Sequence, residues 1–246
     1  MLFKAFGGGF DPIDYIELVA CKDGTDVRVF FETDKAGTPP SWWRVYINDE
    51  LTNQKAEALS FKSGDVVKVV HGGGGGSFFP SYKDFFSEIR GALPRHSTAS
   101  YSQFAYQCSS LKRVPETLLY NMRGTLFAPS RLFEGCGIDS VPKDIFSPLG
   151  TRVASFNWTF SMCRSLVFLD EDIFANFEHI GSMVGTFNNT RLQNVTLRFN
   201  ATTSDDNLGA LTNISAGRLT VIVKKGSQFS QALKASGNGN VTIIEE

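Results

Sequence analysis

Cysteine is the residue type with the most chemical potential in this chain, and three of the four cysteines are regularly spaced. Cys136 follows Cys108 by 28 residues and precedes Cys163 by 27. Thiolates bind zinc, and thiols pair as disulfides or act as nucleophiles, depending on what surrounds them. A nearly constant spacing of this size places one cysteine in each structural repeat, so we expect the three side chains to stack in a column.

Such a column favours buried, reduced thiols that have a structural role. Zinc needs about four converging ligands. The chain has no Cys-x-x-Cys pair, and its histidines (His71, His96 and His179) do not share the repeat phase. Free cysteine is a small hydrophobic residue that is usually well buried. We therefore expect no metal and no cofactor, with disulfide pairing and zinc binding as the less favoured alternatives.

The adjacent carboxylates Asp170, Glu171 and Asp172 have a simpler explanation than acid–base catalysis. They stand where other repeats carry the proline that begins a helical turn, and acidic side chains are favourable near a helix N-terminus. The chain has no nucleophile elbow, zinc-protease helix, Walker loop or dinucleotide fingerprint. The sequence predicts a protein that is not an enzyme, with no catalytic residues.

The cysteines belong to a longer repeat that includes aromatic residues at fixed offsets. Phe133, Phe160 and Phe187 each stand three residues before Cys136, Cys163 and Thr190, the last in a degenerate fourth copy. A period of 20–50 residues indicates stacked units, because one unit cannot bury its own apolar edge. We expect a short solenoid whose core columns are formed by Cys108, Cys136, Cys163, Phe133, Phe160 and Phe187.

Within each repeat we expect a turn before the cysteine, a short strand after it, and then a helical turn. The expected strands cover residues 111–114, 138–141, 166–169 and 192–195, and Pro115 and Pro142 end the first two. Apolar residues at both ends of each strand point inward, so the two residues between them point outward. These outward pairs form a candidate binding face, although they equally fit plain solvated positions: Lys112, Arg113, Asp139, Ser140, Val167, Phe168, Gln193 and Asn194.

The expected fold is mixed α and β, with a small antiparallel β domain followed by a short leucine-rich-repeat-like solenoid with a C-terminal cap. Turn signals separate expected strands at 15–21, 26–32, 42–47 and 65–70. A short helix over 82–89 is expected to cover the first coil. The segments are a glycine-rich arm (1–12), a β-sandwich-like domain (13–71), a glycine linker (72–77), an N-terminal cap (78–100), the repeats (101–200) and a C-terminal strand–helix–strand cap (201–246).

Charge and hydropathy argue against two classes of partner. The 246-residue chain has a net charge of −1 and no run of five basic residues, which disfavours nucleic acid. No stretch approaches the roughly 20 apolar residues of a transmembrane helix, so no membrane insertion is expected. The N-terminus lacks the pattern of a signal peptide, which predicts synthesis in a cytoplasm.

The repeat resembles the BspA-like branch of leucine-rich repeats, whose units look like Phe-x-x-Cys-x-x-Leu-x-x-Ile/Val-Pro-x-x-Leu-Phe. The resemblance covers about residues 101–246, including the C-terminal tail, and one copy lacks a residue after its cysteine while another lacks the proline. It implies a surface-exposed, non-catalytic binding or adhesion protein of the kind found on bacteria and in phage virion proteins. The matching residues are Phe133, Cys136, Ile138, Val141, Pro142, Ile145 and Phe146, then Phe160, Cys163, Leu166, Leu169, Ile173 and Phe174.

An adhesin-type repeat without a visible export signal favours a component of a phage virion, made in the host cytoplasm and released by lysis. In this hypothesis the arm and the β domain bind other virion proteins, and the solenoid binds a host-surface protein or glycan. We expect several copies per particle or a homo-oligomer, in a capsid decoration, tail or fibre. The alternatives are a fragment of a bacterial surface adhesin and an intracellular protein–protein interaction scaffold.

Overall fold

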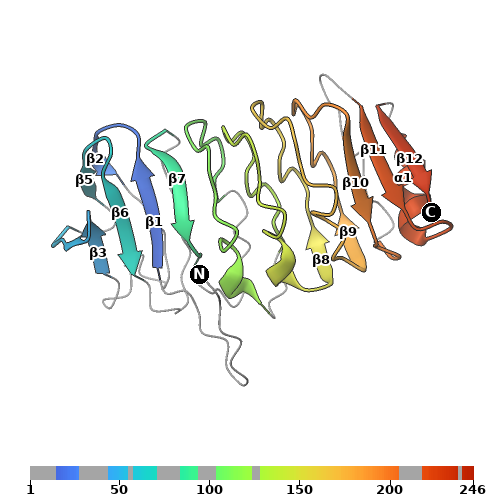
Figure 1. Cartoon of the computed structure of the whole chain (residues 1–246), viewed down its shortest axis with the longest axis horizontal. Helices are drawn as coiled ribbons and strands as arrows, with labels where there is room; N and C mark the ends of the chain where they lie inside the picture. The colour runs from blue at the N-terminus through green and yellow to red at the C-terminus, as the bar shows by residue number, and fades with distance from the viewer. Residues whose placement is uncertain are drawn as a thin grey trace.

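The computed structural model describes residues 15–27, 44–54, 58–70, 84–93, 104–123, 128–204, 218–237 and 240–246. Within these residues the chain is mostly β with one α-helix. An antiparallel sheet is followed by a parallel β-solenoid of about three turns. The colours in Figure 1 run from blue at one end of an elongated body to red at the other, so sequence order is largely preserved along the long axis.

The N-terminal sheet has the strand order β4-β3-β6-β1-β7, and every pair in it is antiparallel. Its inward residues alternate with half-buried ones, as expected of strands with one face in a core. A separate antiparallel pair, β2 (Gly24–Val27) with β5 (Leu59–Phe61), contributes to the same core. The five strands are β1 (Tyr15–Ala20), β3 (Arg44–Ile47), β4 (Glu50–Leu51), β6 (Val66–Val70) and β7 (Phe86–Gly91).

Three of the four strands expected here are confirmed as β1, β3 and β6, whereas β4 and β5 were not predicted. The strand expected at 26–32 is seen only as the end of β2, because residues 28–43 lie outside the described residues. The arm (1–12) and the glycine linker (72–77) also lie outside them.

The helix expected at 82–89 is wrong, because Phe86–Gly91 forms β7. Phe86 and Ile89 are both buried although they stand three residues apart. The spacing arises from a bulge: Ala20 pairs with Phe86 while Val19 pairs with Glu88, so one extra residue of β7 fits between them.

Strand β7 also joins the sheet to the solenoid, because the first coil pairs with its outer edge. Ile89 N donates to Arg113 O (3.0 Å), and Lys112 N donates to Ser87 O (2.8 Å). Glu88 and Arg113 form a parallel bridge. One cluster of buried apolar residues runs through the sheet and the coils. The sheet therefore closes the N-terminal end of the stack, which needs such a cover for solubility.

The turns before the cysteines, which we call the cysteine turns, are hydrogen-bonded from coil to coil. Phe133 N donates to Thr159 O and Phe160 N donates to Thr186 O, both at 3.0 Å. In the backbone bonds between these turns, the donor belongs to the earlier coil and the acceptor to the later one. The residue before each cysteine, or before Thr190, has a left-handed backbone with φ between +56° and +74°: Gln107, Gly135, Met162 and Asn189.

Two strands of the solenoid lie before a cysteine or before its counterpart Thr190, which corrects the expected positions. β8 (Arg152–Ser155) and β9 (His179–Ser182) pair in parallel. Residues 138–141 and 166–169 form no strand, residues 111–114 contribute only the bridge at Arg113, and the fourth expected segment leads into a strand, β10 (Val195–Phe199). Backbone hydrogen bonds in the cysteine turns join these coils. Short 3₁₀ segments follow Pro115 and Pro142: η1 (Tyr120–Met122) and η2 (Ser147–Leu149).

Stacked phenylalanine rings fill the solenoid in two columns. In the first, Phe160 lies between Phe133 and Phe187, with ring centroids 5.8 and 6.0 Å apart. The second runs through four successive layers at 5.2–5.8 Å: Phe146, Phe174, Phe199 and Phe229. Each ring brings a large apolar area to a narrow core, so the columns supply much of the burial that holds the coils together.

The C-terminal strand–helix–strand unit is confirmed. β11 (Leu219–Val223) and β12 (Val241–Glu245) extend the parallel sheet that begins with β10. Between them, α1 (Gln228–Ala235) begins at Ser227, whose hydroxyl accepts from Ser230 N at 3.0 Å. α1 buries Phe229 and Leu233, and Phe229 ends the second ring column. No helix among the described residues is both long and apolar enough to cross a membrane.

Candidate binding face

The eight residues of the candidate binding face are all exposed in the structure. In each of four coils a buried residue comes first, two exposed residues follow, and a second buried residue ends the segment. Thus Leu166 and Leu169 are buried while the pair between them, Val167 and Phe168, is 49% and 61% exposed. The same pattern holds for Lys112 and Arg113, Asp139 and Ser140, and Gln193 and Asn194. The face is one outward pair per coil, arranged along the stack.

Two buried thiols bind the cysteine turn of the preceding coil. The Cys136 thiol donates to Ala105 O and the Cys163 thiol donates to Phe133 O, both at 2.8 Å. All four cysteines are free, and Cys108, Cys136 and Cys163 are buried. Burial raises the pKa of Cys136 well above its usual range and the pKa of Cys163 to about 12. Both groups therefore stay protonated and serve as hydrogen-bond donors between coils.

The glycine after Cys136 lets the first two coils approach closely. A Cβ at Gly137 would collide with Ser109 O, so only glycine fits there. This contact accompanies the repeat copy that lacks one residue after its cysteine. The ammonium of Lys112 donates to Gly137 O at 3.0 Å, which ties the first pair of the face to the second coil.

The chemical character of the face changes from coil to coil. It is basic at Lys112 and Arg113, acidic and polar in the next coil, apolar in the third and amide-rich in the fourth. The Ser140 hydroxyl donates to Asp139 Oδ1 at 2.9 Å, so the two side chains of this pair bind each other. Phe168 is therefore the exposed aromatic side chain within a row of polar pairs.

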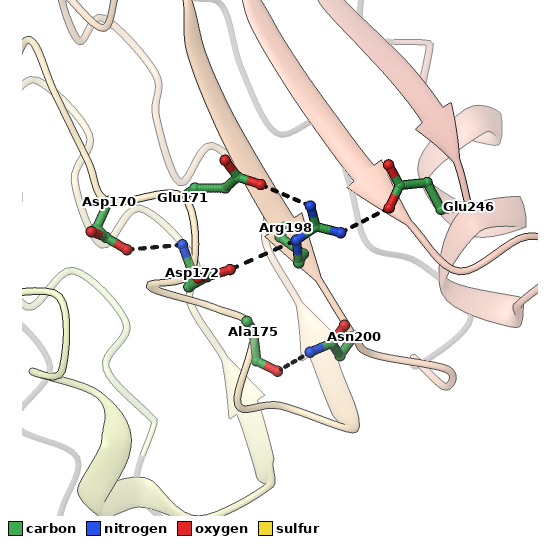
Figure 2. Close-up of polar contacts among 7 residues, drawn as sticks. All are labelled: Asp170, Glu171, Asp172, Ala175, Arg198, Asn200 and Glu246. Atoms are coloured by element: carbon green, nitrogen blue, oxygen red, sulfur yellow. Dashed lines mark hydrogen bonds and ion pairs between the residues drawn. The ribbon is translucent and has the colours of Figure 1, made fainter.

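Next to the apolar pair, an ion cluster connects the third coil to the C-terminal sheet (Figure 2). Its centre is Arg198 on β10, which lies 2.9 Å from Glu171, 2.8 Å from Glu246 and 3.7 Å from Asp172. Hydrogen bonds from the guanidinium to Glu246 and then to Glu171 raise the pKa of Arg198. The cluster fixes the chain just beyond Phe168 to two later strands.

The acidic run makes a local turn contact, at the place where the sequence predicted the start of a helical turn. Asp170 Oδ1 accepts a hydrogen bond from Asp172 N at 3.0 Å, as an acid at the start of a turn does. The sequence did not identify Arg198 as the partner of these acids, because nothing in the spacing from 171 to 198 distinguishes it from other basic residues. The Asn200 amide, which donates to Ala175 O at 2.7 Å, was missed for the same reason.

The described residues contain no group of three His, Cys, Asp or Glu side chains that could hold a metal ion. His179 instead lies 3.0 Å from the Thr203 hydroxyl, through Nδ1. The buried Glu134 carboxylate forms an ion pair with Arg131 at 3.2 Å, and burial raises its pKa. These titratable groups make structural contacts within and between coils.

Comparison with known proteins finds no matching family model, no matching curated protein and no matching solved structure.

Proposed function

We propose that this protein is a non-catalytic binding protein whose solenoid presents the candidate binding face to a macromolecular partner. The observation that carries the proposal is Phe168, which is 61% exposed next to the half-exposed Val167. Contiguous apolar surface on a folded protein is typical of contact sites, and these two side chains are the apolar part of the face. Aromatic side chains at the centre of an interface often dominate its binding energy.

The backbone beneath Phe168 is well held, which would favour binding. Leu166 and Leu169 anchor the segment in the core, and Gln193 N donates to Val167 O at 3.4 Å. On the C-terminal side, Arg198 N donates to Glu171 O at 2.8 Å. A pair presented on a rigid frame loses little conformational entropy when a partner binds, so more of the contact energy appears as affinity.

More specifically, we propose that the protein is a component of a phage virion. It rests on the resemblance of the repeat to BspA-like leucine-rich repeats, with the N-terminal part binding other virion proteins and the solenoid binding a host-surface protein or glycan. A bacterial adhesin and an intracellular scaffold would use the same face. Antibodies against this chain separate these possibilities: labelling of purified particles supports the virion form, and labelling only of host cells without phage contradicts it.

The role of the face is tested by binding of the fluorescently labelled chain to host cells, with two matched variants. Phe168→Ser should reduce binding at least about tenfold, because it removes the exposed aromatic anchor. Leu51→Ser is the control, since Leu51 is exposed to the same degree (63%) but lies in β4, at the far end of the N-terminal sheet. Equal binding by wild type and Phe168→Ser, or equal loss in both variants, would contradict the proposal.

A further inference from the structure

The last strand of the stack, β12, has one edge that no described residue pairs with. It ends the sheet order β10-β11-β12. Asn240 O accepts from Leu219 N, and Glu246 N donates to Val223 O, so even-numbered residues at this end of the chain face β11. Backbone groups alternate in direction along a strand. The N–H and C=O groups of three residues therefore point away from the sheet: Val241, Ile243 and Glu245.

This edge lacks most of the devices that usually prevent strand addition; the charge that it carries, Glu245, points inward and is bound to Lys234 and Ser230 of α1. Natural edge strands are short, bulged, or carry proline or lysine. β12 is five residues long, contains neither residue type and pairs with β11 without a register shift. Its outward side chains are Thr242 and Ile244, and Ile244 is 42% exposed. The opposite edge of the molecule differs, because β4 has only two residues.

We propose that β12 pairs antiparallel with β12 of a second copy of this chain, around a two-fold axis through Ile243. In this register Ile243 faces Ile243 of the second copy, and Val241 faces Glu245 in both directions. All of these are residues whose backbone groups point outward, so each pair exchanges two hydrogen bonds. The outward N–H and C=O groups of both strands are all satisfied. The edge is self-complementary, as a two-fold interface requires.

The side chains fit the same register. Thr242 faces Ile244 of the second copy on the outer surface, at the closer type of antiparallel pair, and this contact covers the exposed isoleucine. No two carboxylates oppose each other, since Glu245 faces Val241 and Glu246 faces Asn240. Pairing of β12 with β4 of another copy would instead match five residues with two and leave most groups unpaired. The arrangement therefore favours a closed dimer over a head-to-tail chain of copies.

Sedimentation equilibrium on the full chain tests the dimer. The wild type should approach twice the chain mass of 27.1 kDa as concentration rises. T242K/I244K places like charges opposite each other in two pairs and should weaken dimerisation at least about tenfold, and T242E/I244E should do the same. Mixing the two variants should restore a dimer, because each lysine then faces a glutamate. Circular dichroism and thermal melts check that both variants remain folded.

Leu51→Lys is the control at the other end of the molecule and should leave the dimer unchanged. A wild type that stays monomeric at every concentration overturns the proposal, as does a dimer that T242K/I244K leaves intact. So does a mixture of the two charged variants that remains monomeric. Species larger than a dimer that disappear in Leu51→Lys would point to head-to-tail assembly instead. None of these results depends on Phe168, so they leave the proposed role of the candidate binding face to its own test.

Discussion

The N-terminal sheet and the solenoid share one core, but they are held together by different interactions. In the sheet, long antiparallel ladders join strands whose buried residues are mainly aliphatic, such as Ile16, Leu18, Val67 and Val69. In the coils between β7 and β10, the one strand pair among the described residues is short (β8 with β9), and the coils are joined by stacked rings and by backbone bonds between turns. A residue in the sheet is held mainly by hydrogen bonds to neighbouring strands. A residue in the solenoid is held mainly by contacts with the equivalent residues of the coils on either side.

The largest effect that separates the two regions should come from the first ring column. Phe160→Ala removes a ring that stacks on two others and leaves a cavity between coils, which should cost about 3–5 kcal/mol. Ile16→Val in the sheet, at an equally buried position, should cost only about 0.5–1.5 kcal/mol. Urea unfolding monitored by circular dichroism gives both values. A Phe160→Ala protein that unfolds like wild type would show that the column does not hold the coils together.

A smaller effect concerns left-handed backbone in the two regions. In the sheet, the turn between β3 and β4 uses Asn48 and Asp49, residue types that tolerate positive φ. In the solenoid, Met162 takes the same conformation at φ +59°, which is unfavourable for its side chain. Met162→Gly should therefore stabilise the protein by about 1 kcal/mol. Asp49→Gly should change the stability by less.

The opposite substitution provides the check on this interpretation. Gly135 occupies the position of Met162 one coil earlier, at φ +74°, and a Cβ there would lie 3.2 Å from Gln107 Cα. Gly135→Ala should therefore destabilise the protein by about 1 kcal/mol or more in thermal melts. If Met162→Gly and Gly135→Ala shift the melting temperature in the same direction, backbone strain is not what distinguishes the cysteine turns.

The smallest effect is electrostatic and lies at the C-terminal end of the stack. Hydrogen bonds from Lys234, Ser230 and Gly226 N lower the pKa of Glu245 from 4.5 to about 2. The stabilisation from this carboxylate is complete above pH 4.5 and is lost as the pH falls towards 2. Glu245→Gln should make the melting temperature less dependent on pH between these two values. In the sheet, bonds from Lys62 N and the Asn48 amide lower the pKa of Asp65, so Asp65→Asn should act in the same direction. An unchanged acid slope in Glu245→Gln would contradict this assignment.

What could be predicted from the sequence was the part that repeats. The 27–28 residue step placed the cysteines and phenylalanines in columns, and the burial pattern of the outward pairs followed from it. The position of the strands did not follow, because the repeat motif marks which residues are buried and not which backbone groups pair. The left-handed residue before each cysteine had no sequence signature, since Gln107, Met162 and Asn189 have no common side-chain chemistry.

Contacts outside the repeat were also beyond prediction. The bulge in β1–β7 places Phe86 and Ile89 on one face although they stand three residues apart, and only the pairing with β1 reveals this. The ion cluster joins Arg198 to Glu171 and Glu246, which are 27 and 48 residues away and belong to different elements. Charged residues on a surface carry no pattern from which such pairs can be identified.

The backbone hydrogen bonds between cysteine turns all run in one direction, which gives the side of the molecule formed by these turns an electrical polarity. In an ordinary parallel ladder the bonds run both ways between neighbouring strands, so their peptide dipoles largely cancel. Here the N–H groups of Arg131, Trp158 and their equivalents all point towards the later coil, so their dipoles add from coil to coil. The effect is comparable to that of an α-helix lying along one edge of the stack. The turns at the C-terminal end of that edge form its positive pole, where an anionic group would be stabilised.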